Sequence, residues 1–193
     1  MESLYHENNR ALQDQFHSRK LADRMIEHIV HDQISDCDRE FIEKRDMFFI
    51  STVGESGFPT VSYKGGAVGF VKVLDQKTIA FPGYDGNGMF LTAGNILSDS
   101  HVGLLFIDFE NQQRMRMHGI ASVILDDPLI KEYPEAQYIV RITVENIFPN
   151  CSRYIHHYQK MESSKFVPKQ GVQTPDAEWK SCDEFKDALP KNV

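Results

Sequence analysis

The sequence predicts a mainly β protein with flanking helices, built as an antiparallel barrel or sandwich. From residue 47 onward, short apolar runs alternate with turn signals roughly every eight to twelve residues, as in all-β domains. Before that point, apolar residues recur at helical spacing between charged positions. With 193 residues, 41% of them hydrophobic, the chain suits one domain with a sizeable core.

The first 46 residues are predicted to form an N-terminal helical arm (residues 1–46). Residues 8–31 have the spacing of one helix, given by Leu12, Phe16, Met25, Ile26, Ile29 and Val30. Ser35 followed by Asp38 matches a capping box, which predicts that a second, short helix begins there.

The barrel itself is predicted to occupy residues 47–160, with about seven strands. They cover residues 47–53, 60–64, 69–74, 78–81, 101–109, 114–125 and 137–144, and a short helix is expected over 88–96. The polar stretch 161–193 is predicted to be a C-terminal extension that packs on the barrel. Within it, a short helix is expected near 183–188.

Several predicted strands are apolar on both faces, as in Phe48-Phe49-Ile50 and in Leu104-Leu105-Phe106-Ile107. An antiparallel sheet normally exposes one polar face. The outer face is therefore expected to be covered, either by the N-terminal helices or by a second subunit, and the sequence leaves both open.

Composition limits the classes of function. A net charge of −7 argues against nucleic-acid binding, and no apolar run approaches the ~20 residues that cross a membrane. The N-terminus lacks the pattern of a signal peptide, so a cytoplasmic protein is expected. Three distant cysteines fit reduced thiols, with Cys151 expected to be buried and structural. No spacing of histidines or cysteines predicts a metal site.

Lys64 is the first candidate for ligand binding. It follows Ser62 at the end of a predicted strand and precedes two glycines, Gly65 and Gly66, where a ligand could approach the backbone closely. A lysine in this position can neutralise a phosphate. The alternative is a solvated lysine in a hairpin.

The segment Gly86–Asn95 is the second candidate. Its glycines permit unusual backbone angles, and a helix beginning there would direct free N–H groups at an anion. Asn87, Thr92 and Asn95 add side-chain donors. The alternative is an ordinary connection from loop to helix, with Asn and Gly as caps.

Arg114 and Arg116 alternate along one predicted strand, so their guanidinium groups share a face with His118. Two neighbouring arginines repel each other unless an anion or a carboxylate lies between them. Asp108 and Glu110 could supply that carboxylate, and ligand binding is the other possibility.

The order of these segments resembles the pyridoxamine 5′-phosphate oxidase-like family of FMN-binding split β-barrels. The resemblance covers about residues 40 to 160 and rests on MFFISTV, GFP, SYKGG, GFV, TIAFP, GNGMFLTAGNIL, VGLLFIDF and Gly119. It implies a six-stranded split barrel that forms a homodimer, with FMN at the subunit interface.

Carried over to this chain, the resemblance implies a set of cofactor contacts. Ser62 and Lys64 would face the phosphate and ribityl chain, beside Gly65. Asn87, Met89 and Phe90 would lie along the flavin loop, with Thr92 and Asn95 near the phosphate. Arg114 would reach the flavin from the partner subunit, and Arg116 shares its face.

The chain also departs from the family pattern. Family members that oxidise pyridoxamine phosphate usually carry an Arg-Lys pair where Gly88 and Met89 stand. They also end with an Arg-x-His motif and a Trp-Arg-Leu-type close, where this tail has only Trp179-Lys180 and Leu189-Pro190. The expected function is therefore a dimeric FMN-dependent oxidoreductase with another small-molecule substrate or electron donor. A flavin- or haem-binding protein without rapid turnover is the alternative, with His118 or His156 as axial ligand. A structural dimer without a cofactor is the third hypothesis.

Overall fold

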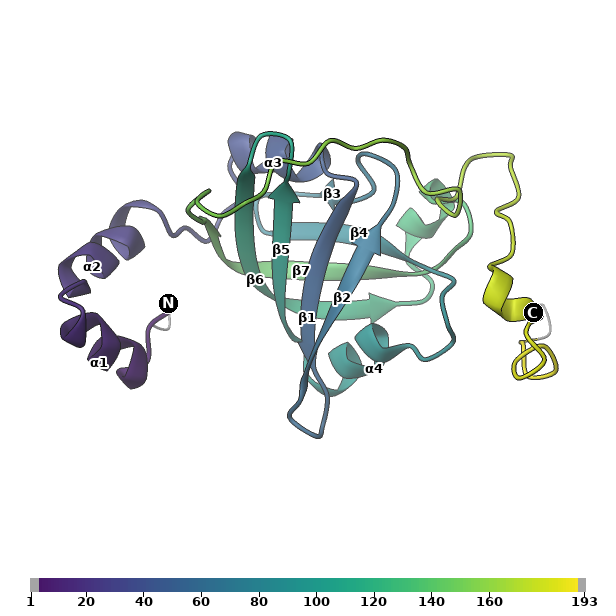
Figure 1. Ribbon diagram of the computed structural model, residues 1–193, viewed down its shortest axis with the longest axis horizontal. Coiled ribbons are helices and arrows are strands. Elements are labelled where there is room, and N and C mark those ends of the chain that lie inside the picture. The colour runs from purple at the N-terminus through teal and green to yellow at the C-terminus, as the bar shows by residue number, and fades with distance from the viewer. Residues whose placement is uncertain (1–3, 191–193) are drawn as a thin grey trace.

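The computed structural model describes residues 4–190 and confirms the predicted class, a curled antiparallel sheet with flanking helices (Figure 1). Seven strands in this range form one sheet in the order β2-β1-β5-β6-β7-β4-β3. They are β1 Met47–Val53, β2 Pro59–Gly65, β3 Lys72–Val73, β4 Thr78–Tyr84, β5 His101–Asp108, β6 Gln113–Ile124 and β7 Ala136–Pro149. Since β2 and β3 are edge strands, the barrel is split rather than closed.

The core lies on the inner face of this sheet, where alternate residues are buried. Phe48 of β1 is fully buried, and its ring centroid lies 5.0 Å from Phe81 of β4 and 5.1 Å from Phe106 of β5. Met115 and Met117 continue the inner face along β6. Large aromatic rings from distant strands thus hold the two halves of the sheet together.

The predicted strand over 69–74 is reduced to the two residues of β3. Gly69 adopts a φ of +81°, a left-handed conformation that strands do not contain, and the chain bends there. Phe70 and Val71 are buried in the core from this bend. Apolar side chains can therefore fill a core from a loop as well as from a strand. For this reason the hydrophobic pattern alone overestimated the length of this strand.

The predicted helix over residues 8–31 is two helices, α1 Glu7–Gln15 and α2 Arg19–His28. His17, between them, has a φ of 54°, which ends α1 and reverses the chain. The next helix, α3 Asp36–Glu43, begins as predicted, because Ser35 and Asp38 form a capping box.

Only α3 of these three helices packs into the barrel. Ile42 of α3 and the nearby Ile34 belong to the core, whereas α1 and α2 bury no residue and stand clear of the sheet (Figure 1). The expectation that the N-terminal helices cover the outer face is therefore wrong for α1 and α2. Among the described residues, the outer face of β2, β1 and β5 remains partly exposed.

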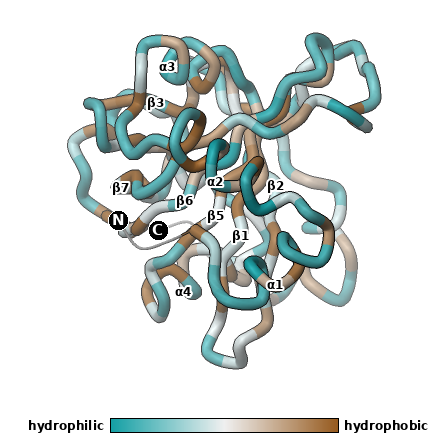
Figure 2. The backbone as a smooth tube through the Cα atoms, turned by 90° about the vertical axis from the view of Figure 1, so that its left-hand side faces the viewer, coloured by the Kyte–Doolittle hydropathy of each residue, from teal (hydrophilic) through white to brown (hydrophobic). Residues whose placement is uncertain are grey.

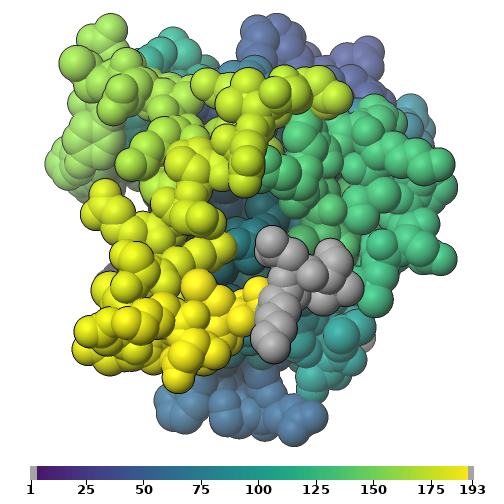
Figure 3. All heavy atoms as spheres, turned by 90° about the vertical axis from the view of Figure 1, so that its right-hand side faces the viewer, coloured from purple at the N-terminus to yellow at the C-terminus, as the bar shows by residue number. Residues whose placement is uncertain are grey.

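Beyond β7, the chain runs over the surface and wraps one side of the barrel (Figure 3). Ion pairs fasten it at two points, Lys160–Asp46 (2.5 Å) and Lys180–Asp85 (2.6 Å). The helix expected near 183–188 is replaced by a short 3₁₀ helix, η2 Glu178–Ser181, and the last three residues of the predicted extension lie outside the described range. A second 3₁₀ helix, η1 Pro128–Glu132, precedes β7. No helix within residues 4–190 is long and apolar enough to span a membrane.

Candidate cofactor site

The site begins on the edge strand β2, where Ser62 and Lys64 point toward the inner side of the sheet. Ser62 pairs with Ile50 and Lys64 with Phe48, two fully buried residues of β1. Directly opposed residues in an antiparallel pair lie on the same face. Alternation along β2 thus directs a cation and a hydroxyl toward the end of the helix α4 (Leu91–Ser98).

A chain of hydrogen bonds connects these residues to α4. Lys64 donates from Nζ to Oγ1 of Thr92 (2.9 Å), and Thr92 donates from Oγ1 to Oγ of Ser62 (3.1 Å). Burial lowers the pKa of Lys64, and no carboxylate of residues 4–190 forms an ion pair with it. A half-buried cation without a counter-charge favours binding of an anion.

The N-terminus of α4 lies at the same place. Its N-cap residue, Phe90, makes no capping hydrogen bond through its side chain and has a φ of 50°, an uncommon conformation for a large residue. The first-turn N–H groups of a helix have no partner within the helix, and the helix dipole favours negative charge there. Lysine, hydroxyls and free amides thus converge at one place, which we call the candidate anion site.

The loop before α4 contributes an apolar surface beside the candidate anion site. Met89, Phe90 and Leu91 are largely exposed, and the ring of Phe90 lies 6.5 Å from that of Tyr138. Asn87 accepts a hydrogen bond from the backbone N–H of Met89 (3.1 Å), so its side chain shapes the loop.

Two other predicted residues lie near the candidate anion site without pointing toward it. Asn95 donates to Thr52 Oγ1 (3.0 Å), so its amide fastens α4 to β1. A Cβ on Gly65 would lie 2.7 Å from Cε1 of Tyr63, so this glycine makes room for a ring on the outer face. Their positions suit support of the site more than contact with a ligand.

Arg114 and Arg116 lie on the opposite face of the sheet from Lys64. Their partners on β5 are Ile107 and Leu105, and the inward residues of β6 are the buried Met115 and Met117. Within one chain, the fold therefore keeps the arginines away from the candidate anion site, because alternate residues of a strand point to opposite faces.

The two arginines have no counter-charge in the described part of the chain. Asp108 pairs with Arg45 (2.6 Å), and Glu110 accepts from the backbone N–H of Lys160 (3.1 Å). The expectation that these carboxylates neutralise the arginines is therefore wrong. The buried Nε of Arg114 has no hydrogen-bond partner either. A buried donor without an acceptor is costly, which favours an outside ligand or subunit at this face.

The two histidines that could serve a haem differ in environment. His118 is half-buried and its ring contacts Phe148 edge-on (5.5 Å between centroids). Burial, with a smaller effect of Arg116, lowers the pKa of His118 and keeps the imidazole neutral. His156 is exposed beside Tyr158.

A groove of about 760 Å³ lies between the outer face and the C-terminal segment 158–168. Met47, Tyr63 and Ile107 line it from the strands, and Tyr158 and Phe166 from the segment. Sequence analysis missed this groove, and it missed Tyr138 beside Phe90. No local pattern distinguishes these aromatic residues, because only the crossing of distant segments brings them together.

A split antiparallel barrel, with a lysine and two hydroxyls gathered between an edge strand and a helix N-terminus, defines the class of this protein. Residues 34–165 match the family model described as pyridoxamine 5′-phosphate oxidase, and the chain belongs to this family. No curated protein sequence matches the chain.

Among solved structures, HupZ of Group A Streptococcus matches with 18% identity and a TM-score of 0.50, over 65% of this chain and 99% of HupZ. A single-residue variant of HupZ matches with 19% identity and a TM-score of 0.50, over 61% of this chain and 99% of the other. HutZ, a haem storage protein from Vibrio cholerae, has 18% identity and a TM-score of 0.45, over 60% and 94%. At these identities the likeness to HupZ concerns the fold alone.

Proposed function

We propose that this protein is an FMN-binding oxidoreductase that works as a homodimer. One observation carries the proposal: Lys64, Thr92 and Ser62 form a connected, half-buried group at the free N-terminus of α4. The cation lacks a carboxylate partner within residues 4–190, and the helix end lacks a side-chain cap. Because the chain belongs to this family, we expect the anion to be the phosphate group of FMN.

The chemistry of the candidate anion site fits a phosphate. A phosphate monoester carries nearly two negative charges and three acceptor oxygens, so it needs several donors that converge from different directions. Lys64 would supply the charge, the hydroxyls of Ser62 and Thr92 two donors, and the first turn of α4 backbone N–H groups. The exposed apolar surface of Met89 and Phe90 would support a flat ring.

When bound, the cofactor would supply the hydride and electron transfer chemistry of a flavin. The residues of the chain would hold the cofactor and adjust its charge. Arg114 or Arg116 would stabilise negative charge on the reduced ring, because a fixed cation is most effective where charge develops. No described side chain needs to act as an acid or base.

A second subunit would bring those arginines into the site. Since Arg114 and Arg116 face away from Lys64 of their own chain, they can serve the cofactor only across an interface. Exposed apolar residues on the same outer face, Val61 (67% exposed) and Tyr63 (61%), suit burial in a homodimer.

The substrate is proposed to be a small molecule other than pyridoxamine phosphate. Gly88 and Met89 occupy the place of the cationic pair that such oxidases usually carry, so the loop supplies no charge for a second phosphate.

The three cysteines are free and exposed, which suits a reducing compartment and supports a cytoplasmic location.

Haem binding without rapid turnover is the second candidate, favoured by one observation. The lowered pKa of His118 keeps its imidazole neutral, the form that ligates iron. An absorption spectrum of the purified protein, before and after addition of FMN and of haem, tests both candidates. Flavin bands that remain after gel filtration support the proposal, and a Soret band that His118→Ala abolishes supports haem. A spectrum unchanged by either cofactor contradicts both.

A further inference from the structure

The hairpin of α1 and α2 carries large apolar side chains that nothing in the described chain covers. Leu12 and Phe16 of this hairpin are 54% and 71% exposed, and Leu21 and Met25 are 65% and 40% exposed. Each pair is spaced by four residues, so its two members lie on the same side of their helix and form an apolar stripe.

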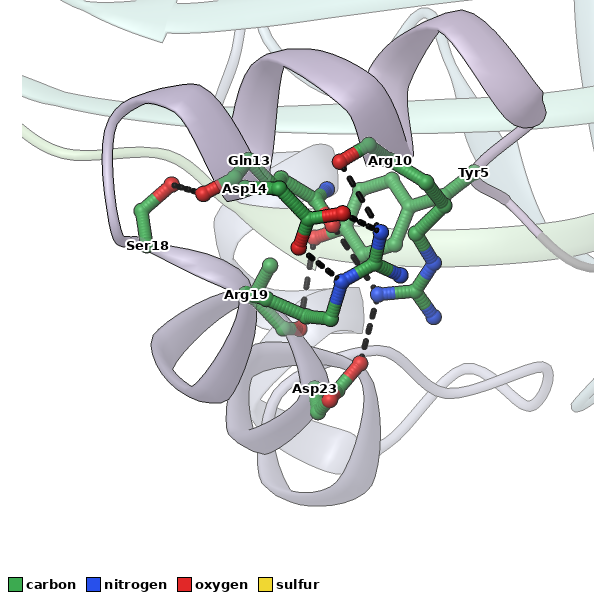
Figure 4. Close-up of polar contacts among 8 residues, drawn as sticks. Tyr5, Arg10, Gln13, Asp14, Ser18, Arg19 and Asp23 are labelled. Atoms are coloured by element: carbon green, nitrogen blue, oxygen red, sulfur yellow. Dashed lines mark hydrogen bonds and ion pairs between the residues drawn. The ribbon is translucent and has the colours of Figure 1, made fainter.

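Polar contacts give the hairpin its shape (Figure 4). Arg19 pairs with Asp14, Arg10 pairs with Asp23 (2.6 Å), and Arg19 also donates to the carbonyl of Arg10 (3.0 Å). Exposed ion pairs contribute only about 0–1 kcal/mol each. Helices of 9 and 10 residues are shorter than the ~12–15 that isolated helices need in water. The hairpin therefore requires an apolar partner to be stable.

The base of the hairpin is fixed to the barrel. His31 and Ile147 of β7 exchange two backbone hydrogen bonds (3.0 and 2.7 Å), and Ile34 donates to the carbonyl of Gln76 (2.7 Å). Next to this point, Phe148 pairs with Arg116 on the outer face of β6. The hairpin thus leaves the barrel at the rim of the face that carries the unpaired arginines.

The hairpin projects outward from this side without packing on its own sheet. In Figure 1 it stands clear of β6, and in Figure 2, seen from that side, it lies in front of β1, β5 and β6. The helices α1 and α2 contain four carboxylates and four Lys or Arg residues, so they carry no net charge with histidine neutral. Nothing in that balance favours a nucleic acid or an anionic membrane.

We infer that the α1–α2 hairpin of one copy packs its apolar stripes on a second copy of this chain. The partner offers exposed apolar residues of its own: Phe58, Val61 and Tyr63 on the β1–β2 hairpin. This contact would continue the outer-face interface of the proposed homodimer, so it rests on the proposed function. It would also explain why short helices with no buried residue persist in this chain.

Sedimentation of the full chain tests this contact. The double substitution Leu12→Glu and Phe16→Glu is expected to weaken the dimer by roughly tenfold or more, because two charges would enter an apolar contact. The matched control, Asn8→Glu with Gln15→Glu, adds the same charge at exposed polar positions of α1 and should leave the dimer unchanged. Since α1 buries no residue, both variants keep the barrel, and thermal unfolding checks this.

Hydrogen exchange gives a second measurement on the unaltered chain. Amides of α1 and α2 should be protected well above the dissociation constant of the dimer and lose that protection on dilution below it. The inference would be overturned by any of three results. The dimer could be equally stable in both variants, the protection of the α1 and α2 amides could be unchanged by dilution, or the chain could stay monomeric. FMN titration tests the proposed function separately. If the dimer depends on the hairpin but the protein does not bind FMN, the proposed cofactor is wrong and the hairpin contact is still supported.

Discussion

Lys64 on β2 and Thr92 on α4 are 28 positions apart in the chain, and a hydrogen bond of 2.9 Å joins Nζ of the lysine to Oγ1 of the threonine. This contact directs the cation toward the N-terminus of α4, where free amides already favour negative charge. The edge strand and the helix end thereby contribute to one candidate anion site.

Replacing Lys64 by alanine should weaken FMN binding by roughly 1–3 kcal/mol, the range for hydrogen bonds to charged groups. Fluorescence titration of apoprotein with FMN measures the effect. Lys131→Ala is the matched control, because Lys131 is exposed on η1, outside the candidate anion site. Equal affinity in the Lys64→Ala variant and the wild type would remove Lys64 from the site.

FMN affinity should fall at alkaline pH before an ordinary lysine would titrate. Burial lowers the pKa of Lys64 from its usual value of 10.5, so the free protein loses this positive charge at a lower pH. Lys64→Arg should remove that alkaline decrease, since arginine stays protonated. Titrations between about pH 7 and 10 compare the two proteins, and identical pH profiles would contradict the assignment.

The stability contributed by His31 should be present in acid and lost as the pH rises. Burial of its ring opposes protonation, but contacts with the carbonyl of Ile29 (2.9 Å) and the carboxylate of Asp38 (2.8 Å) outweigh it and raise the pKa of His31. Both partners accept, so only the imidazolium can donate to both. The contribution is thus full below the unfolded pKa of about 6.5 and disappears as the pH passes the higher folded value.

The substitution His31→Gln tests this pH dependence. The difference in unfolding free energy between wild type and variant should be largest near about pH 5.5 and shrink toward about pH 8, measured by urea denaturation. His28→Gln serves as control, because His28 is exposed at the end of α2. A difference that is constant with pH would show that the imidazole is neutral throughout.

Gly119→Ala should destabilise the fold by about 1–3 kcal/mol, as overpacked sites do. A Cβ at Gly119 would lie 2.5 Å from the carbonyl oxygen of Thr143, at the bulge between β6 and β7, and backbone cannot move aside easily. Gly103→Ala is the control on the neighbouring strand, where the nearest atom would be 4.0 Å away. Equal unfolding free energies of the two variants would contradict this account.

Cys151 should be the most reactive of the three cysteines. It is exposed, contrary to the expectation of a buried thiol, and hydrogen bonds from the backbone N–H and the guanidinium of Arg153 lower its pKa. A larger thiolate fraction reacts faster with alkylating agents. Mass spectrometry after brief treatment with iodoacetamide should find Cys151 modified before Cys37 and Cys182. The substitution Arg153→Ala should reduce this difference in the rate of modification.

Local patterns in the sequence determined most of the elements. Alternation placed the strands, and the spacing from Ser35 to Asp38 placed the start of α3, because capping depends on residues three positions apart. The same patterns predicted one helix where the structure has two, since the left-handed conformation of His17 leaves no mark in hydrophobic spacing. They also extended β3 over Phe70, which is buried from a bend.

The sequence alone also identified Ser62, Lys64 and Thr92 as candidates, because cations, hydroxyls and glycines near a helix start suit phosphate wherever they lie. Only the tertiary structure decided that these three meet and that Arg114 and Arg116 face the other way. Only the tertiary structure shows that Asp108 forms an ion pair with Arg45, so that this carboxylate does not neutralise Arg114 or Arg116. Such relationships depend on strand register and on the crossing of distant segments, which residue types and local spacing do not encode.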